Sequence, residues 1–345
     1  MTKVYVGMSG GVDSSLTAAL LKEQGYDVTG VYMKNWTQDL PGMRCPWADD
    51  LADAKRVAVQ LGIDFKVFDF EKEYKQKVVD YMIDEYKLGR TPNPDIMCNQ
   101  EVKFKIFLET ALEDGAEMIA TGHYARVENG VLKQAVDGNK DQTYFLYRVT
   151  GEALSKTLFP LGEFTKPQVR EMAKERGLYT AGKKDSQGIC FVGQIGIREF
   201  LSQYVEQVAG PIIDKQTGKV LAQHDGAIFY TIGQRHGLDI GGGLPYYVVG
   251  KDMEKNEVYV TTDLNDDKLW KPELRLTSVH WINEPPKEGS YQIRVRHRAG
   301  LIEASLAYQN NELVLTPTNP ERAVAAGQSV VVYDGDVCLG GGIVA

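Results

Sequence analysis

Two cysteines that are far apart in the sequence, Cys98 and Cys190, stand in polar segments rather than in apolar runs. Cys98 ends the stretch NPDIMC (residues 93–98), after a turn-forming group of small polar residues and proline, and Cys190 lies in KKDSQGICF (residues 183–191), close to two lysines. Nearby cations favour the thiolate, the reactive form of a cysteine. A structural cysteine is normally a small buried apolar residue, so this setting predicts thiols that water and a substrate can reach. Such a pair could carry out nucleophilic and thiol–disulfide chemistry.

A glycine-rich run, GMSGGVDSS (residues 7–15), joins an apolar strand pattern to a helical pattern. Its two adjacent glycines let the backbone turn tightly and approach a ligand closely. Ser9, Ser14 and the free N–H groups at the start of the helix would form an anion site, where Asp13 could help to hold Mg²⁺. The run lacks the lysine of a P-loop and does not match G-x-G-x-x-G. A plain glycine-rich turn with a serine cap is the alternative, but the strand–turn–helix context favours a nucleotide site.

The first part of the chain contains the elements that must position these groups. Strand patterns alternate with helical patterns, which predicts a doubly wound parallel sheet covered by helices on both faces. The strands are expected at residues 3–8, 26–33, 63–70 and 117–121, and the helices at 15–22, 49–61, 71–88, 103–113, 166–176 and 197–205. Asn129-Gly130 predicts a hairpin turn between short strands. We expect this α/β domain, with its helical extension, to span residues 1–209.

The remaining sequence changes character and predicts two small β-rich modules. Glycine, proline and asparagine turns separate short alternating runs. We place a central module at residues 210–272 and a last module, expected to be a β-barrel, at residues 273–345. The strands are expected at 227–232, 246–249 and 257–261 in the first module, and at 291–296, 302–308 and 329–333 in the second.

The composition restricts the class of protein. The chain has 345 residues, a net charge of −8 and no apolar run long enough to span a membrane, and its N-terminus enters a strand pattern without the layout of a signal peptide. We therefore expect a cytoplasmic protein without a membrane partner. The four scattered cysteines suit neither a disulfide framework nor a zinc site. The acidic total argues against a general nucleic-acid coat, although it allows a local basic surface.

One such surface is predicted in the last module. The run RVRHR (residues 294–298) follows a strand pattern, and strand alternation would place Arg294, Arg296 and Arg298 on one side, which suits a phosphate backbone. An ordinary solvated face is the alternative.

Six sequence blocks carry a resemblance to a known family. In chain order they are SGGVDSS, TPNPDIMCN, TGHYAR, KDQTYFLY, DSQGICF and AGQSVVVYDGDVCLGGG. Together they resemble the bacterial tRNA-specific 2-thiouridylase family of the PP-loop ATP pyrophosphatase superfamily, from one end of the chain to the other. The resemblance implies an ATP-dependent sulfurtransferase that converts the wobble uridine of tRNA for lysine, glutamate and glutamine to 2-thiouridine.

The resemblance also implies roles for individual residues. Cys190 would carry a persulfide, Cys98 would be the partner nucleophile that forms a disulfide with it, and Asp95 would be an acid/base group. The nucleotide would be bound by Gly7, Met8, Ser9, Gly10, Gly11, Val12, Asp13, Ser14, Met33 and Gly122. The tRNA would be contacted by Asn93, Pro94, Asp95, His123, Lys140, Asp141, Gln142, Arg296, His297 and Gln328.

The implied cofactors and partners are ATP with Mg²⁺, tRNA, and a cysteine desulfurase or sulfur-relay protein that supplies the persulfide sulfur; we expect a monomer. Three alternatives stay open at this point. An amidating ligase would use the ATP site without the cysteine pair, and a non-catalytic nucleotide-sensing module that binds RNA would never release AMP. A redox or iron–sulfur role would engage Cys45 together with Cys98 and Cys190. His123 could also be a strand-end histidine with a local hydrogen bond, and Lys140 to Gln142 an exposed turn.

Overall fold

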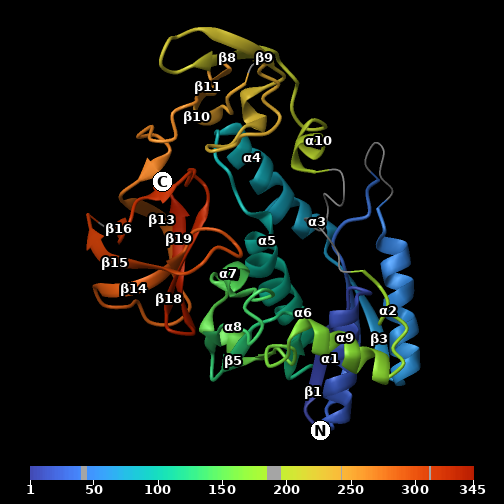
Figure 1. The fold of residues 1–345 in the computed structure, drawn as a ribbon. Helices are drawn as coiled ribbons and strands as arrows, with labels where there is room; N and C mark the ends of the chain where they lie inside the picture. The colour runs from blue at the N-terminus through green and yellow to red at the C-terminus, as the bar shows by residue number, and fades with distance from the viewer. Residues whose placement is uncertain (40–44, 185–195, 242, 311) are drawn as a thin grey trace.

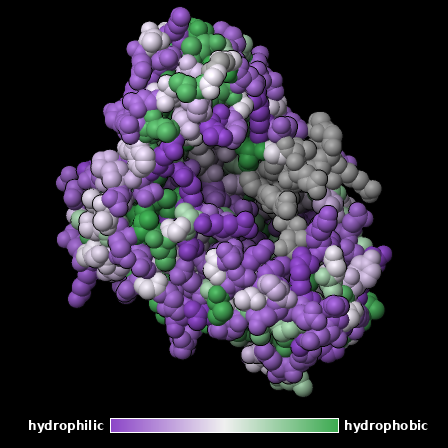
Figure 2. Space-filling view, viewed as in Figure 1, coloured by the Kyte–Doolittle hydropathy of each residue, from purple (hydrophilic) through white to green (hydrophobic). Residues whose placement is uncertain are grey.

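The computed structural model describes residues 1–39, 45–184, 196–241, 243–310 and 312–345. The chain forms three parts: an α/β domain (blue to green), a small β module (yellow) and a β-barrel (orange to red), as Figure 1 shows. On the face seen in Figure 2 the molecule is hollowed where these parts meet, and hydrophilic residues surround much of the hollow. No helix formed by the described residues is long and apolar enough to cross a membrane.

The α/β domain is built on a sheet of five parallel strands in the order β3-β2-β1-β4-β7. The strands are β1 (Lys3–Gly7), β2 (Asp27–Lys34), β3 (Asp64–Asp69), β4 (Met118–Ala120) and β7 (Thr157–Leu158). Alternate residues of β1 face opposite layers: Val4 and Val6 pack with α1 (Val12–Glu23) and α2 (Trp47–Leu61), whereas Tyr5 packs with the helices of the other face. The predicted doubly wound sheet is confirmed.

Of the two long helices of the second face, one matches its predicted length and the other is longer. The expected helix at 71–88 runs as α3 (Glu71–Tyr74), a π-helical stretch η1 (Lys75–Asp80) and α4 (Tyr81–Lys87). The helix expected at 103–113 starts nine residues earlier, at Pro94. It comprises α5 (Pro94–Met97), a second π-helical stretch η2 (Cys98–Ile106) and α6 (Phe107–Glu113). Short helices complete the domain: α7 (Thr143–Leu146), α8 (Gly151–Ser155), α9 (Lys166–Glu175) and α10 (Ile197–Leu201).

The central module contains a four-stranded sheet in the order β10-β11-β8-β9. Its strands are β8 (Gly210–Asp214), β9 (Val220–His224), β10 (Tyr247–Asp252) and β11 (Glu257–Thr261). The strand expected at 227–232 is wrong: Ala227–Phe229 form a 3₁₀ turn, η3, after Gly226, whose φ is 151°. From this turn Ala227 is buried against the sheet and Ile228 is buried in the core of the α/β domain, so the apolar pattern reflects burial rather than a strand.

The last module is the expected barrel, closed by pairing of its first and last strands. Its strands are β13 (Leu274–Trp281), β14 (Gly289–Arg294), β15 (Ile302–Gln309), β16 (Glu312–Pro317), β18 (Ser329–Asp334) and β19 (Val337–Val344). A separate two-stranded ladder joins β12 (Trp270–Lys271) and β17 (Glu321–Arg322). The predicted hairpin, β5 (Arg126–Glu128) and β6 (Val131–Lys133), belongs to the α/β domain but extends the barrel's sheet, because β6 pairs with β19.

Candidate functional site: a phosphate loop and a cysteine helix

The glycine-rich run forms a tight loop between β1 and α1, at the carboxyl edge of the sheet. The Ser9 backbone N–H donates to Ser14 Oγ at 3.1 Å, and Ser14 Oγ donates to the Gly11 carbonyl at 3.2 Å. Gly10 has a φ of +72°, and a Cβ at this position would lie 2.4 Å from the backbone oxygen of Asp50 on α2. Only glycine fits there, so the loop lies directly against α2.

Two further residues predicted at the nucleotide site lie beside this loop. Gly122 follows β4, and a Cβ on it would lie 2.9 Å from the backbone of Asp13 and Ser14 at the start of α1. Met33, on β2, would come within 3.0 Å of a Cβ on Gly7. Sequence order reverses between β1 and β4, and ligands of doubly wound sheets bind at the carboxyl edge of such a switch point. The structure thus brings together the predicted nucleotide residues.

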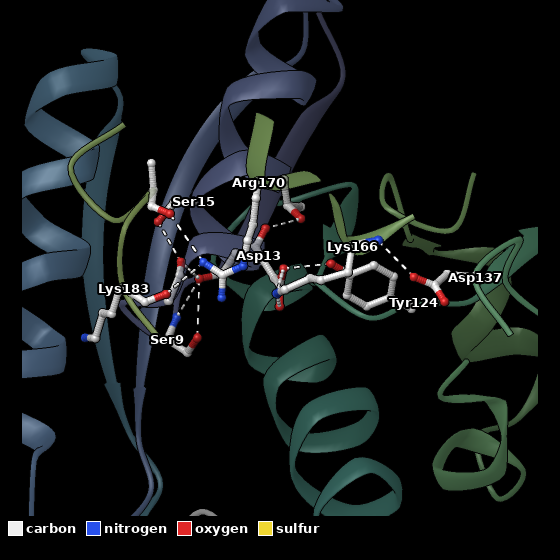
Figure 3. A network of polar contacts seen from close by, with 12 residues as sticks. Ser9, Asp13, Ser15, Tyr124, Asp137, Lys166, Arg170 and Lys183 are labelled. Carbon is white, nitrogen blue, oxygen red and sulfur yellow. Dashed lines mark hydrogen bonds and ion pairs between the residues drawn. The ribbon is translucent and has the colours of Figure 1, made fainter. Parts of the chain in front are cut away.

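Asp13 is held by a lysine that the sequence analysis missed. Its carboxylate accepts two hydrogen bonds from Lys166 Nζ, at 2.7 and 2.8 Å, and one from the Tyr124 hydroxyl at 2.9 Å (Figure 3). Lys166 begins α9 and is only 8% exposed, and its backbone N–H donates to Asp137 at 2.8 Å. The one local signal was the helix start at Thr165-Lys166-Pro167, which indicates a cap but not its partner.

The Asp13 carboxylate is already paired with a lysine, and its expected help in holding Mg²⁺ stays a prediction. Lys166 already neutralises its carboxylate, and the described residues contain no group of three or more histidine, cysteine or carboxylate side chains that could hold a metal ion. A phosphate group needs N–H donors rather than carboxylates, and the loop together with the start of α1 supplies them. The site therefore suits a nucleotide better than a metal held by the protein alone.

The segment that leads to the second cysteine motif is fixed close to the loop. Lys183 Nζ forms ion pairs with Asp50 and Asp53 of α2 at 2.7 and 2.8 Å. Arg170 of α9 donates to the Lys183 carbonyl at 3.1 Å (Figure 3). Burial lowers the pKa of Lys183, but the two carboxylates outweigh it and the net shift is upward. We expected this lysine to favour a thiolate at Cys190, but its ammonium group is paired with two carboxylates of α2. Cys190 itself lies outside the described residues.

Cys98 does not lie in an exposed turn, which corrects the sequence-based expectation. Asn93 caps a helix: its side-chain oxygen accepts from the backbone N–H groups of Asp95 and Ile96 at 3.0 and 3.4 Å, and Pro94 takes the first helical position. Asparagine at the cap followed by proline is a helix start as well as a turn signal. The helix continues through Cys98, which is 4% exposed.

Burial also changes the chemistry expected of this helix. It raises the pKa of the Cys98 thiol; Lys103 opposes this effect and Asp95 adds to it. Burial likewise raises the pKa of the Asp95 carboxyl, with Lys103 opposing. Cys98 is therefore a protonated thiol at rest rather than the thiolate that we expected. Asp95 is shifted in the direction that suits a proton-transferring group near neutral pH.

His123 is a buried residue, contrary to its expected contact with tRNA. Its ring is 8% exposed and packs between Phe104 and Phe159, at centroid distances of 5.5 and 6.0 Å. Its Nδ1 shares a 2.7 Å hydrogen bond with the Thr121 hydroxyl, which is the local interaction of the alternative interpretation. Burial, followed by Lys103, lowers the pKa of His123 well below its usual value. Through Phe104, this histidine packs η2 against the end of β4.

The segment at 140–142 is not the exposed turn that its composition suggested. Asp141 is 2% exposed and pairs with Arg294 of the barrel at 2.7 Å, while Gln142 accepts from the Tyr124 backbone at 2.9 Å. Lys140 is half-buried. The Asp141–Arg294 pair holds the barrel on the α/β domain, so direct contact between Asp141 and tRNA is not supported.

The predicted basic strand face is also corrected. β14 ends at Arg294, and Arg298 has a φ of +64°, so the residues of RVRHR do not alternate along a strand. Arg296 is exposed, but its guanidinium donates to backbone carbonyls of the 322–323 segment. His297 packs on Phe145 with a centroid distance of 4.4 Å. The remaining predicted tRNA residue, Gln328, is half-buried and accepts from the Ala325 backbone at 3.1 Å.

Comparisons with known proteins agree with this architecture. Three family models match consecutive parts of the chain: a tRNA methyl transferase HUP domain over residues 2–194, a tRNA methyl transferase PRC-barrel domain over residues 198–262 and an aminomethyltransferase β-barrel domain over residues 271–344. The fold and these models define a three-part protein of the tRNA-modifying class.

The similar proteins narrow this class to one family. The chain is 49% identical over 348 residues to the tRNA-specific 2-thiouridylase MnmA of Bacillus cytotoxicus, covering 99% of this chain and 94% of the relative. The proteins of the same name from Bacillus thuringiensis (strain Al Hakam) and Bacillus cereus (strain Q1) are 49% identical over 349 residues, with the same coverage. The chain therefore belongs to the tRNA-specific 2-thiouridylase family.

Proposed function

We propose that this protein is an ATP-dependent sulfurtransferase that makes 2-thiouridine at the wobble position of tRNA for lysine, glutamate and glutamine. The observation that carries the proposal is the place of the phosphate loop. It lies at the switch point of a sheet whose next helical layer carries Cys98, in a chain 49% identical to 2-thiouridylases over nearly its whole length. The hollow in Figure 2 is where we propose that the anticodon arm enters.

The ATP site would activate the uracil oxygen that sulfur replaces. A uracil carbonyl oxygen is a poor leaving group, so the C2 oxygen is first joined to the α-phosphate of ATP and pyrophosphate departs. The backbone N–H groups of residues 10–14, at the N-terminus of α1, would stabilise the charge on that pyrophosphate. Lys166 keeps the Asp13 carboxylate paired and so preserves the positive potential of the loop. Mg²⁺ would arrive bound to the nucleotide and shield its phosphates.

Sulfur transfer then requires two thiols. The outer sulfur of a Cys190 persulfide attacks C2, AMP leaves, and the base is joined to Cys190 through an S–S bond. The Cys98 thiolate attacks the Cys190 sulfur, that S–S bond breaks, and the thiocarbonyl of 2-thiouridine is released. Two thiols are oxidised to a disulfide while the transferred sulfur is reduced, so an external thiol must regenerate the enzyme.

The buried Cys98 thiol must lose its proton before it attacks. We propose that the Asp95 carboxylate, three residues earlier on the same helix, accepts this proton. The sulfur would come from a cysteine desulfurase, directly or through a relay protein. The enzyme would work in the cytoplasm, where its tRNA substrates are used.

Nucleoside mass spectrometry tests the proposal. An unmodified lysine tRNA transcript is incubated with the protein, ATP, Mg²⁺, a cysteine desulfurase and free cysteine, in parallel with Cys98→Ala, Cys190→Ala and, as a control thiol on strand β19 of the barrel, Cys338→Ala. We expect 2-thiouridine from the unaltered protein and the Cys338 variant, none from Cys190→Ala, and from Cys98→Ala only what the free cysteine in the mixture releases from a protein–RNA adduct. Formation of AMP without thiolation would contradict the proposed substrate. Thiolation by both of the other variants would contradict the two-thiol mechanism.

A further inference from the structure

The two residues that directly follow Cys98 are both held by the segment 145–148. Asn99 Nδ2 donates to the Phe145 carbonyl at 3.0 Å. Arg148 donates from Nε to the side-chain oxygen of Gln100. These contacts cross from η2 to α7 and to the connection that follows it, more than forty residues later in the chain. The position of the Cys98 helix is thus tied to segment 145–148.

The same arginine reaches the barrel on its other side. Arg148 Nη1 donates to the Ser278 carbonyl at 2.7 Å, and Nη2 lies 3.3 Å from the Ser278 hydroxyl. One residue of β13 therefore offers two acceptors to one guanidinium, which a planar fork of donors is suited to bind. Arg148 therefore contacts the barrel at Ser278 and the Cys98 helix at Gln100, with no residue in between.

The barrel is distorted where it meets this arginine. Ser278 has a φ of +47°, which is uncommon for a residue other than glycine. The pairing of β13 with β19 is interrupted between Thr277 and His280, the stretch that contains Ser278. Backbone strain of this kind persists only where surrounding contacts maintain it, and it collects at functional sites. Here the distortion leaves the Ser278 carbonyl available to Arg148 rather than to the sheet.

The helix that Arg148 contacts, η2, requires stabilising contacts from other parts of the fold. η2 is π-helical over nine residues and begins at Cys98 itself. π-helical turns are rare and occur mainly as single turns, often at functional sites, so a stretch of this length depends on tertiary contacts. The barrel can supply a fixed reference, because the buried Asp141–Arg294 pair and a 2.8 Å bond from the Gly151 N–H to the Ile282 carbonyl anchor it to the α/β domain.

We propose that Arg148 is a positioning residue for sulfur transfer: it sets the Cys98 helix, through Gln100, against the distorted strand of the barrel. The inference rests on the proposed function, since it gives Cys98 the task of releasing the sulfur. Arg148 touches neither the sulfur nor the base. Its loss affects the geometry of the Cys98 attack and leaves the earlier adenylation and persulfide attack intact.

The test is a single-turnover reaction with excess persulfide-loaded enzyme and a lysine tRNA transcript. Arg148→Met and Arg148→Lys are compared with Arg275→Met, a matched change on β13 whose partners, Glu273 and Glu312, lie within the exposed side of the barrel module. We expect the rate of 2-thiouridine formation to fall at least about tenfold in both Arg148 variants. Lysine does not rescue, because it lacks the fork that reaches Ser278 and Gln100 together. We expect Arg275→Met to form 2-thiouridine at the rate of the unaltered protein, and all three variants to keep their affinity for tRNA.

Two readouts separate positioning from a loss of stability. Slow attack by Cys98 leaves tRNA joined to Cys190, so the Arg148 variants should accumulate a protein–RNA adduct on non-reducing gels, as Cys98→Ala does. Added dithiothreitol should then release 2-thiouridine from that adduct. In addition, Arg148→Met combined with Gln100→Ala should be no slower than Arg148→Met alone, because residues that act through one contact are not additive.

The inference is overturned by full activity in Arg148→Met, by rescue in Arg148→Lys, or by slow turnover without the adduct. If Arg148→Met does not fold, Gln100→Ala alone decides: adduct accumulation supports the inference and its absence refutes it. The proposed function fails differently, because the unaltered protein then makes no 2-thiouridine, and the inference falls with it.

Discussion

Replacing Gly10 with alanine should disable the phosphate loop. Gly10 has a φ of +72°, where a side chain costs about 1 kcal/mol. The new Cβ would also lie 2.4 Å from the Asp50 backbone oxygen, whereas contacts shorter than 3.0 Å essentially do not occur, so the loop or α2 must move by at least 3.0 − 2.4 = 0.6 Å. A displacement approaching 1 Å can cost about a hundredfold in function. We expect ATP affinity to fall at least tenfold.

Gly25, just beyond the other end of α1, supplies a matched control. Its φ is +86°, yet a Cβ there meets no atom within 4 Å. Gly25→Ala should therefore cost about 1 kcal/mol of unfolding free energy and leave ATP binding unchanged, whereas Gly10→Ala should lose more stability and most of its ATP binding. Thermal unfolding and isothermal titration with ATP measure both effects. Equal ATP affinity in the Gly10 variant and the unaltered protein would refute the close approach of loop and α2.

Three further predictions concern charged groups. Lys166→Met leaves the Asp13 carboxylate without its cation, and should lower the free energy of unfolding by about 3 kcal/mol and weaken ATP binding in a titration. Asp141→Asn leaves a buried guanidinium unpaired at the barrel interface, and should cost a similar amount in denaturant unfolding, with the barrel released first. Burial raises the folded-state pKa of Asp95, so this group stabilises the fold below its unfolded pKa and that contribution is lost as pH rises through the folded pKa. Asp95→Asn should therefore stabilise the protein at neutral pH and not near pH 4, as thermal unfolding at both pH values would report, while abolishing thiolation.

Each of these expectations has a contrary result. Unchanged ATP affinity in Lys166→Met would mean that the pair is only structural. Unfolding of Asp141→Asn in one unshifted transition would show that the interface does not depend on the ion pair. Equal stability of Asp95→Asn and the unaltered protein at all pH values would contradict the burial of this carboxyl group.

The parts of the site that could be predicted from the sequence are local. The phosphate loop needs adjacent glycines, a serine and a helix start within nine residues, so its function is visible in the run itself. The parallel sheet follows from alternating periodicities in the same way. The turn of the loop and the single strands and helices depend on neighbours in the chain, although the strands that pair in the sheet are distant in sequence. The structure confirms both the loop and the sheet, and ATP binding stays a prediction.

The sequence-based predictions fail where contacts between residues far apart in the chain determine the structure. The segment containing Asn93 and Pro94 suits a turn or a helix start, and tertiary packing of Cys98 and Asn99 selects the helix. Lys166 and Arg148 bind partners more than forty residues away, and no local pattern reveals such pairs. Basic residues such as Arg294 seemed exposed because charge favours solvent, but a carboxylate from another domain allows burial.

If ATP activates the C2 oxygen of the wobble uridine, that oxygen must leave with AMP, and an isotope experiment can follow it. A lysine tRNA carrying a heavy-oxygen label at C2 of that uridine is thiolated to completion, and the released AMP is examined by mass spectrometry. We expect AMP to carry the label, because in the proposed mechanism the uridine oxygen leaves with the α-phosphate. Label found in pyrophosphate or water, with unlabelled AMP, would contradict it.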